Sequence, residues 1–110
     1  MLGVILRYWR GWTTPDNADE YYKIVSEQVL PGIAKRRLDG YHGAYLLRRD
    51  LDQEVEFATV MIFESLDSIR AFAGEDYETA YVPPAARAVL ARFDEKSAHY
   101  TILRTPEQTR

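Results

Sequence analysis

The sequence of 110 residues contains no cysteine. Disulfide bonds, thiol catalysis and cysteine-ligated metal sites are therefore excluded. A basic excess is also missing, because 14 Lys and Arg residues stand against 17 Asp and Glu residues, for a net charge of −3. Proteins that bind nucleic acid generally need a surplus of positive charge to hold the phosphate backbone. We therefore expect no nucleic-acid partner.

Long apolar runs are missing as well. No segment reaches the roughly 18 consecutive apolar residues that indicate a membrane-spanning helix. The apolar N-terminal segment contains Arg7 and Arg10, which interrupt the continuous apolar stretch of a secretory signal. We expect a cytoplasmic protein with no membrane partner.

Several catalytic motifs are absent too. The sequence has no glycine-rich phosphate loop, no serine in a nucleophile elbow and no pair of carboxylates at a readable catalytic spacing. Its two histidines, His42 and His99, form no cluster with Asp or Glu at the spacing of metal ligands. We therefore expect neither a metal site nor a bound cofactor.

What the sequence does contain is enough for one globular domain. Hydrophobic residues make up 46% and charged residues 28%, which suits a packed core inside a hydrated surface. We expect a single domain over residues 1–104 and a polar tail over 105–110. Aromatic residues reach 13%. Core packing accounts for most of them, but Tyr and Trp also suit an apolar pocket with a few polar groups.

Residues 55–74 form the stretch around which the chain is organised. They predict a strand, 55–63, that leads through Ser65 as helix N-cap into a short helix ending at Gly74. Side chains alternate along a strand, and here both sides are apolar, so the strand should be central and covered on both faces. One side holds Val55, Phe57, Thr59, Met61 and Phe63, and the other Ala58, Val60 and Ile62.

Hydrophobic spacing and turn residues predict the remaining elements. In chain order we expect a strand, a helix interrupted near Pro31, two strands joined by a hairpin, two helices and a last strand, over 3–12, 14–37, 41–49, 55–63, 65–74, 83–94 and 97–104. This order predicts an α+β ferredoxin-like sandwich, with a four-stranded antiparallel sheet and helices on one face.

The uncovered face of such a sheet would be apolar whichever way the strands turn. The pattern leaves open whether it carries Trp9, Phe57, Met61 and Phe63 or their neighbours of opposite parity. Either set is more apolar surface than a monomer usually exposes. We therefore expect a homodimer that stacks the two sheets face to face.

Four segments resemble the antibiotic biosynthesis monooxygenase superfamily, and together they span residues 3–103. They read VILRYWRGWTTPDNADEYY, VLPGI with DGYHGAYLLRR, VEFATVMIFESLDSIRAFAG and VPPAARAVLARFDEKSAHYTIL. The resemblance implies a dimeric α+β barrel and a small stand-alone bacterial member. Relatives of this kind oxidise polyketide-like aromatics without metal or flavin, degrade haem, or have no known activity. Fold alone therefore does not decide the function.

The resemblance also bears on haem degradation. Trp9 takes the place of an Asn that polarises the substrate in haem-degrading relatives, and Phe63 takes the place of a functional Trp. Those relatives also need a helical His as iron ligand, whereas His42 and His99 are both predicted on strands. We therefore expect that this chain does not degrade haem.

His99 and Arg7 are the candidate catalytic residues. An imidazole changes charge near neutral pH, so His99 could carry a proton, although a structural histidine at the barrel rim explains it as well. Arg7 shares a strand face with Trp9 and could hold a carboxylate or enolate. The alternative is a salt bridge between subunits, because a buried lone charge is costly.

The candidate substrate contacts are aromatic or apolar, and each tyrosine among them could equally serve packing. They are Trp9, Tyr45, Phe57, Met61, Phe63, Tyr77 and Tyr81. We expect a cofactor-independent monooxygenase-like protein that binds a small apolar or aromatic molecule between helices and sheet. The alternatives are a non-catalytic binding or stress-related barrel, and a structural dimer whose aromatics fill the barrel. A void beside Trp9 and Phe63 would exclude the last of these.

Overall fold

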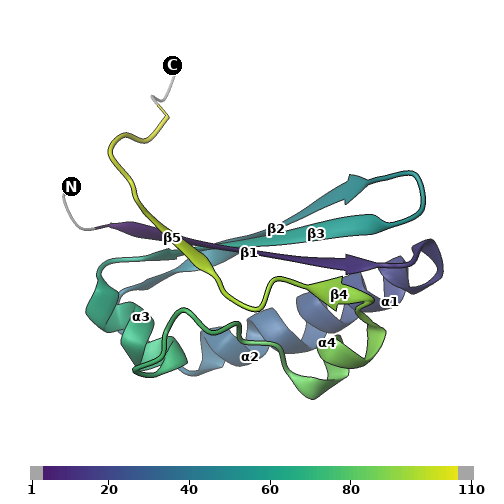
Figure 1. Ribbon diagram of the computed structural model, residues 1–110. Coiled ribbons are helices and arrows are strands. Elements are labelled where there is room, and N and C mark those ends of the chain that lie inside the picture. The colour runs from purple at the N-terminus through teal and green to yellow at the C-terminus, as the bar shows by residue number, and fades with distance from the viewer. Residues whose placement is uncertain (1–3, 107–110) are drawn as a thin grey trace, which may run out of the picture.

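Five antiparallel strands form one sheet in the computed structural model, which describes residues 4–106 (Figure 1). The order across the sheet is β2-β3-β1-β4, and β5 also pairs with β1. The strands are β1 (Ile5–Thr13), β2 (Tyr41–Asp50), β3 (Val55–Phe63), β4 (Arg92–Phe93) and β5 (Ala98–Thr101). The predicted central position of residues 55–63 is confirmed, since β3 lies between β1 and β2.

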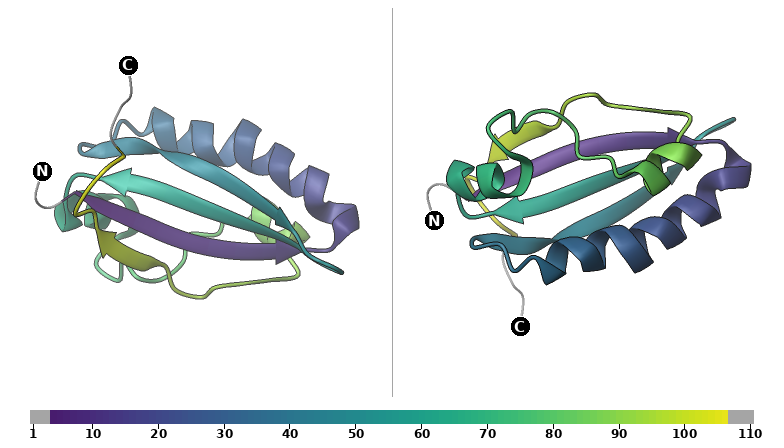
Figure 2. Two further views of the ribbon diagram at one scale, coloured as in Figure 1. Left: turned by 90° about the horizontal axis from the view of Figure 1, so that it is seen from above. Right: turned by 90° about the horizontal axis from the view of Figure 1, so that it is seen from below.

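The helices all lie on one face of this sheet (Figures 1 and 2). The chain therefore has the predicted α+β ferredoxin-like architecture. The helical segments are η1 (Pro15–Asn17), α1 (Ala18–Ile24), η2 (Val25–Val29), α2 (Leu30–Lys35), α3 (Leu66–Ala73) and α4 (Pro84–Val89). None of the helices within residues 4–106 is long and apolar enough to cross a membrane.

The first long helix continues through Pro31 instead of breaking there. The interruption expected at Pro31 takes the form of a π-helical segment, η2, in which Leu30 N–H donates to the Val25 carbonyl five residues earlier. Proline lacks an N–H and crowds the preceding turn of a regular α-helix. A wider π turn next to it relieves that crowding and turns Val25 and Leu30 towards the sheet.

The last part of the chain differs from the prediction. The helix expected over 83–94 ends at Val89, and Phe93 lies in strand β4. Ala91 N–H donates to the Trp12 carbonyl at 2.7 Å, and Asp94 N–H to the Arg10 carbonyl at 2.9 Å. The segment after Val89 therefore pairs with the free edge of β1, because unpaired backbone groups at a sheet edge favour strand pairing over a continued helix.

The same edge explains why the sheet has five strands instead of four. β5 pairs with residues 5–8 of β1, and β4 pairs with residues 11–12 of the same edge. The predicted last strand over 97–104 is correspondingly shorter, at Ala98–Thr101. Of the predicted tail over 105–110, residues 107–110 lie outside the described part of the chain, as do residues 1–3.

Helix α3 forms as the sequence predicts. The Ser65 hydroxyl accepts from Ser68 N–H at 3.2 Å, and the Ser68 hydroxyl accepts from Ser65 N–H at 3.0 Å, which is a reciprocal capping box. Gly74 ends the helix at φ 92°, a conformation that glycine adopts at little cost.

Burial shows which side chains of each strand point towards the helices, a question that the sequence leaves open. Arg7, Trp9, Phe57, Met61 and Phe63 all point towards the helices and are buried. The alternative in which these apolar residues form the uncovered face is therefore wrong, because they build the core against the helices. The uncovered face, called the open sheet face below, carries Leu6, Tyr8, Tyr45, Leu47, Ala58, Val60, Ile62 and Tyr100.

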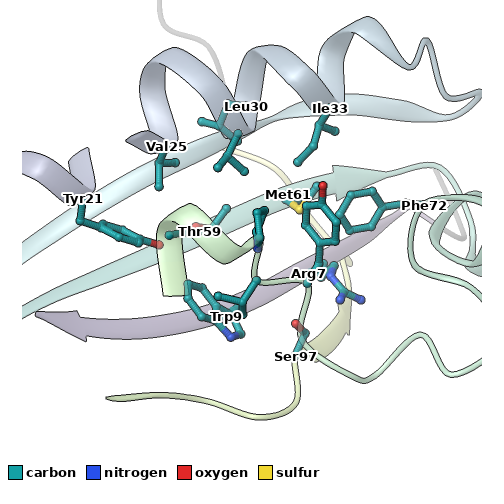
Figure 3. A pocket seen from close by; sticks show the side chains of 15 residues that line it. Arg7, Trp9, Tyr21, Val25, Leu30, Ile33, Thr59, Met61, Phe72 and Ser97 are labelled. Carbon is teal, nitrogen blue, oxygen red and sulfur yellow. The ribbon is translucent and has the colours of Figure 1, made fainter. Parts of the chain in front are cut away.

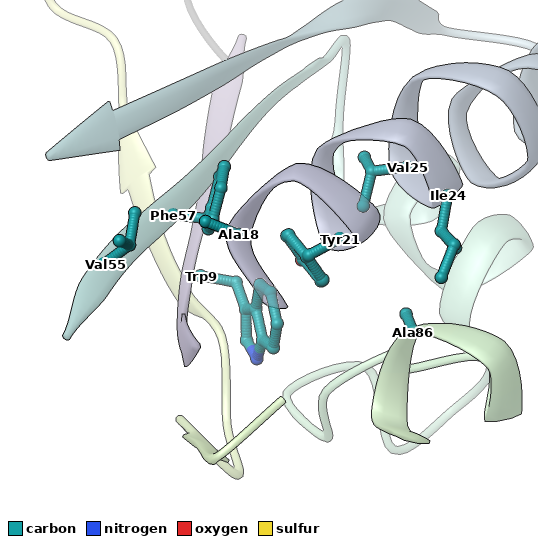
Figure 4. Close-up of a cluster of buried hydrophobic side chains, with 8 residues drawn as sticks. All are labelled: Trp9, Ala18, Tyr21, Ile24, Val25, Val55, Phe57 and Ala86. Atoms are coloured by element: carbon teal, nitrogen blue, oxygen red, sulfur yellow. The ribbon is translucent and has the colours of Figure 1, made fainter. Parts of the chain in front are cut away.

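Two apolar clusters make up the core between sheet and helices. One surrounds Trp9, Tyr21 and Phe57 at the α1–α4 end (Figure 4). The other surrounds Met61, Phe63 and Phe72 at the α3 end. Val29 and Leu30 touch both clusters, so the π segment lies at their junction. A pocket opens where the two clusters meet.

Candidate functional site

A pocket lies between the long helix and the sheet, at the junction of the two core clusters (Figure 3). Its empty volume is about 530 Å³ with its mouth included, and about 50 Å³ of this admits the centre of a water molecule. The enclosed part thus holds a few waters, and the rest of the space is open to solvent at the mouth. Its walls are Arg7, Trp9, Tyr21, Val25, Val29, Leu30, Ile33, Thr59, Met61, Phe72, Tyr81, Val82, Pro83, Ala86 and Ser97.

Arg7 is a buried cation at one end of this pocket, with 2% of its surface exposed. Its Nη1 donates to the Tyr77 carbonyl and to His99 Nε2, and its Nη2 donates to the Thr79 carbonyl at 3.1 Å. The ring of Phe72 lies 5.4 Å from the guanidinium carbon. Burial lowers the pKa of Arg7 to about 10, so it still holds its charge at neutral pH.

The partners of Arg7 are all neutral. Within residues 4–106 it forms no ion pair with a carboxylate, and Nε and one N–H of Nη2 have no hydrogen-bond partner there. A buried charge without a counter-ion is costly, so an anion in the pocket would be favoured. The same hydrogen bonds fix the connector between α3 and α4, residues 74–83, against β1.

His99 lies behind Arg7 and does not line the pocket. The two residues are direct partners across β1 and β5, and Arg7 Nη1 lies 2.9 Å from His99 Nε2. Arginine only donates, so Nε2 is the acceptor and the proton of neutral His99 is on Nδ1. Burial, and secondly the charge of Arg7, lower the pKa of His99, while Glu78 opposes this.

Trp9 forms a wall of the pocket with its ring carbons. Its Nε1–H donates to the Asp94 carbonyl at 2.7 Å, so the polar edge of the indole is tied to β4. The ring passes over Gly11, where an added Cβ would lie 2.7 Å from Trp9 Cη2. Glycine at this position lets the indole lie flat beside the cavity.

Tyr21 is a site residue that the sequence prediction missed. It comes from α1, is 2% exposed and lines the pocket, and its hydroxyl points into the cavity (Figure 3). That hydroxyl forms no hydrogen bond within residues 4–106, and it is accessible from the pocket. The helical spacing of Tyr21 indicates only a core position. The one sign of a pocket is its polar hydroxyl on an otherwise apolar helix face.

The other predicted contacts divide into three groups. Met61 and Tyr81 line the pocket together with Arg7 and Trp9. Phe57 and Phe63 are fully buried in the core and do not line it. The void that would exclude a completely filled barrel is therefore present beside Trp9 but not beside Phe63.

Tyr77 and Tyr45 lie elsewhere. Tyr77 acts on the site through its backbone carbonyl, which holds Arg7, and its ring packs edge-on against His99 at 5.3 Å. Tyr45 pairs with Val60 on the open sheet face and is 65% exposed, so the sheet separates it from the pocket. Reading which face of β2 points inward needs the strand register, which the sequence does not supply.

The second histidine also lies outside the pocket. His42 is on β2, about half exposed, with Nε2 3.4 Å from a Glu64 carboxylate oxygen. Within residues 4–106, no group of three His, Asp or Glu side chains is arranged to hold a metal ion.

Fold and pocket together define an α+β ferredoxin-like sandwich with a largely apolar pocket between sheet and helices. No protein-family model matches the sequence, and no curated protein matches it either. Solved structures do match over nearly the full length. A structure assigned to the antibiotic biosynthesis monooxygenases, from Bacillus cereus, has 9% identity and a TM-score of 0.69, with 98% of this chain and 99% of that chain covered.

Two further structures come from Streptomyces. SnoaB from Streptomyces nogalater, a cofactor-independent oxygenase, has 19% identity and a TM-score of 0.55, with 97% of this chain and 96% of that chain covered. The monooxygenase from the gene ActVA-Orf6 of Streptomyces coelicolor, solved with nanaomycin D, has 14% identity and a TM-score of 0.60, with 99% and 93% covered. The chain therefore has the fold of the antibiotic biosynthesis monooxygenases, and at these identities the likeness concerns the fold alone.

Proposed function

We propose that the protein is a cofactor-independent monooxygenase whose substrate is a small aromatic ring ketone with an acidic CH2 group. The observation that supports this most is the buried Arg7 cation, which faces an apolar pocket without a carboxylate partner. In an apolar pocket, a single cation strongly stabilises negative charge that develops on a bound molecule. Two structural neighbours described as a monooxygenase and a cofactor-independent oxygenase agree with this chemistry.

The proposed reaction begins with loss of a proton from the CH2 group. The enolate that forms has its negative charge on the ring oxygen, and the free N–H groups of Arg7 stabilise it there. The enolate then transfers electrons to O2. One oxygen atom becomes the new carbonyl and the other leaves as water with the two hydrogens of the CH2 group, so that R2CH2 and O2 give R2CO and H2O.

The structure suggests a different role for His99 than that of proton carrier. Its Nε2 lone pair faces Arg7 and it does not line the pocket. We propose that His99 positions Arg7 and that the substrate proton leaves through water at the pocket mouth, where Tyr81 is 46% exposed.

The proposed working unit is a cytoplasmic homodimer formed through the open sheet face. Tyr45, Leu47 and Tyr100 on that face are 65%, 48% and 56% exposed in the single chain. An apolar face of this kind is typical of an interface, and a second copy would cover it with a matching surface.

A second candidate function is binding without turnover. The residues that line the pocket include no carboxylate and no imidazole, so no side chain there is an obvious base. A protein that stores or senses an aromatic anion would need the same Arg7 and the same walls, but no proton acceptor.

The test is oxygen consumption with a three-ring ketone whose CH2 group lies between two aromatic rings. With 18O2, we expect one labelled oxygen atom in each product molecule. Arg7→Gln should lower kcat/KM by about 100-fold, the usual effect of removing an oxyanion donor. Arg10→Gln is the matched control, because Arg10 pairs with Asp94 outside the pocket and its loss should leave kcat/KM unchanged. Saturable binding of the ketone without oxygen uptake would contradict the oxygenase and support the binding function.

A further inference from the structure

The hydroxyl of Tyr21 is a buried polar group aimed into the pocket without a partner. Tyr21 is 98% buried, and its ring is held against Phe57 at a centroid distance of 4.7 Å. Burial raises the pKa of the Tyr21 phenol, so it stays protonated and able to donate at any physiological pH. Because it forms no hydrogen bond within residues 4–106 and is accessible from the pocket, this hydroxyl can donate to a group that enters the pocket.

Tyr21 and Arg7 stand at opposite ends of the same cavity (Figure 3). Between them the walls are apolar, with Trp9, Met61 and Leu30 closest to the middle of the view. A molecule that fills the space would therefore be apolar in its centre and polar at its two ends.

The polar groups around the cavity are rich in donors. Arg7 can only donate, and Tyr21, Thr59, Ser97 and Tyr81 each carry a hydroxyl. Among residues 4–106 no carboxylate lines the cavity, so no side chain there is an acceptor only. The complementary molecule thus carries oxygen acceptors at its ends.

We propose that the pocket binds a flat aromatic molecule with an anionic oxygen at the Arg7 end and a neutral carbonyl oxygen at the Tyr21 end. Tyr21 is then a specificity-determining residue, because a ligand without the second acceptor leaves its hydroxyl unpaired in an apolar site. This inference rests on the proposed function, in that the same pocket holds the substrate, but it concerns binding and not turnover.

The experiment is isothermal titration calorimetry with three single-ring probes of nearly equal shape. 4-Acetylbenzoate has both acceptors, 4-ethylbenzoate lacks the carbonyl, and 4-methylacetophenone lacks the anion. We expect 4-acetylbenzoate to bind about fivefold more tightly than 4-ethylbenzoate, the usual effect of one neutral hydrogen bond. It should also bind about tenfold more tightly than 4-methylacetophenone, since a charged hydrogen bond is stronger.

One conservative variant and its control test whether Tyr21 sets the preference for acetyl over ethyl. Tyr21→Phe removes one oxygen atom and should abolish the preference for acetyl over ethyl while keeping the preference for the anion. Tyr22→Phe is the matched control, because Tyr22 is next on the same helix, 56% exposed and outside the pocket. It should bind all three probes as the original chain does. Circular dichroism melts of both variants check that they are folded.

Two results would overturn the inference. One is equal acetyl-to-ethyl selectivity in Tyr21→Phe and in the unmodified chain. The other is the absence of saturable binding of all three probes. Failure of the proposed oxygenase gives a different pattern. The probes then bind with the Tyr21 dependence and the preference for the anion described above, but no ring ketone consumes oxygen.

Discussion

The guanidinium of Arg7 donates to Nε2 of His99 at 2.9 Å, across a directly paired position of β1 and β5. This contact requires His99 to be neutral, since a protonated imidazole has no acceptor to offer. Burial and the charge of Arg7 both disfavour protonation, and both lower the pKa of His99. The pair therefore links the pH of the solution to the position of the pocket cation.

The first prediction concerns stability between pH 7.5 and 5.5. The unfolded chain binds a proton at His99 near its ordinary pKa of 6.5, whereas the folded chain binds it only at lower pH. The stabilising contribution is thus present above pH 6.5 and is lost as the pH falls from there through the folded pKa. Urea unfolding of the original chain should show this loss, and His99→Gln, which keeps an acceptor but cannot titrate, should show less of it.

His42 supplies the control for this experiment. It is half exposed and lies beside Glu64 on β2, which β3 separates from β1 and Arg7. His42→Gln should therefore keep the pH dependence that His99→Gln loses. Identical pH profiles for the original chain and His99→Gln would show that the Arg7–His99 contact does not govern stability in this range.

The second prediction concerns the closeness of Gly11 and Trp9. A Cβ at position 11 would lie 2.7 Å from Trp9 Cη2 and 2.9 Å from Leu90 Cδ2, both too close to be tolerated without movement. Gly11→Ala should push the indole into the pocket and lower the free energy of unfolding by about 1–3 kcal/mol, as overpacking does. Tryptophan fluorescence and urea unfolding measure the two effects.

Gly32 is the matched control for this substitution. Nothing lies within 4 Å of the position of its added Cβ, and it sits inside α2. Gly32→Ala should leave the tryptophan spectrum unchanged and raise stability by about 0.5–1 kcal/mol through helix propensity. An unchanged spectrum in Gly11→Ala would mean that the indole does not lie where the structure places it.

The sequence predicted the elements that local chemistry determines. Alternation in 55–63 predicted a central strand, and Ser65 and Gly74 predicted both ends of α3, because caps and side-chain period act within a few residues. Phe93 was assigned to a helix and lies in a strand. Its conformation depends on pairing with the edge of β1 some 80 positions earlier, which no local pattern reveals.

The site was predictable to a smaller extent. Of the candidates taken from the sequence, Arg7, Trp9, Met61 and Tyr81 do line the pocket. Tyr21 was missed, because a tyrosine at helical spacing indicates a core residue, and only the structure shows the direction of its hydroxyl. Whether a buried side chain faces a void or a neighbour depends on packing in three dimensions.

The third prediction concerns the connector that closes the pocket. Arg7→Met would leave the Tyr77 and Thr79 carbonyls without their donor. Both hydrogen bonds are half-buried, and a buried carbonyl that loses its donor costs about 1–3 kcal/mol, so we expect stability to fall by about 2 kcal/mol. Residues 74–83 should also be cut faster in limited proteolysis.

Arg36 provides a comparison of the same kind at the surface. It donates to the Ala71 and Phe72 carbonyls, at 3.3 and 3.2 Å, in an exposed to half-buried position where water can replace it. Arg36→Met should change the free energy of unfolding by no more than about 0.5 kcal/mol. Equal losses in the two variants would mean that the burial of Arg7 contributes nothing to holding the connector.

The last prediction concerns the open sheet face. Val60 lies between Tyr8 and Tyr45 in the strand register, on an apolar surface that no helix of residues 4–106 covers. A stable interface needs about 800 Å² from each partner, and a charge at its centre is costly because it loses its water. Val60→Lys should therefore convert a dimer to a monomer in sedimentation velocity, while leaving the circular dichroism spectrum unchanged. Glu27→Lys, on the exposed side of the long helix, introduces the same side chain away from this face and should remain dimeric. If the unmodified chain sediments as a single subunit, the open sheet face has another partner or none, and the pocket is complete within one subunit.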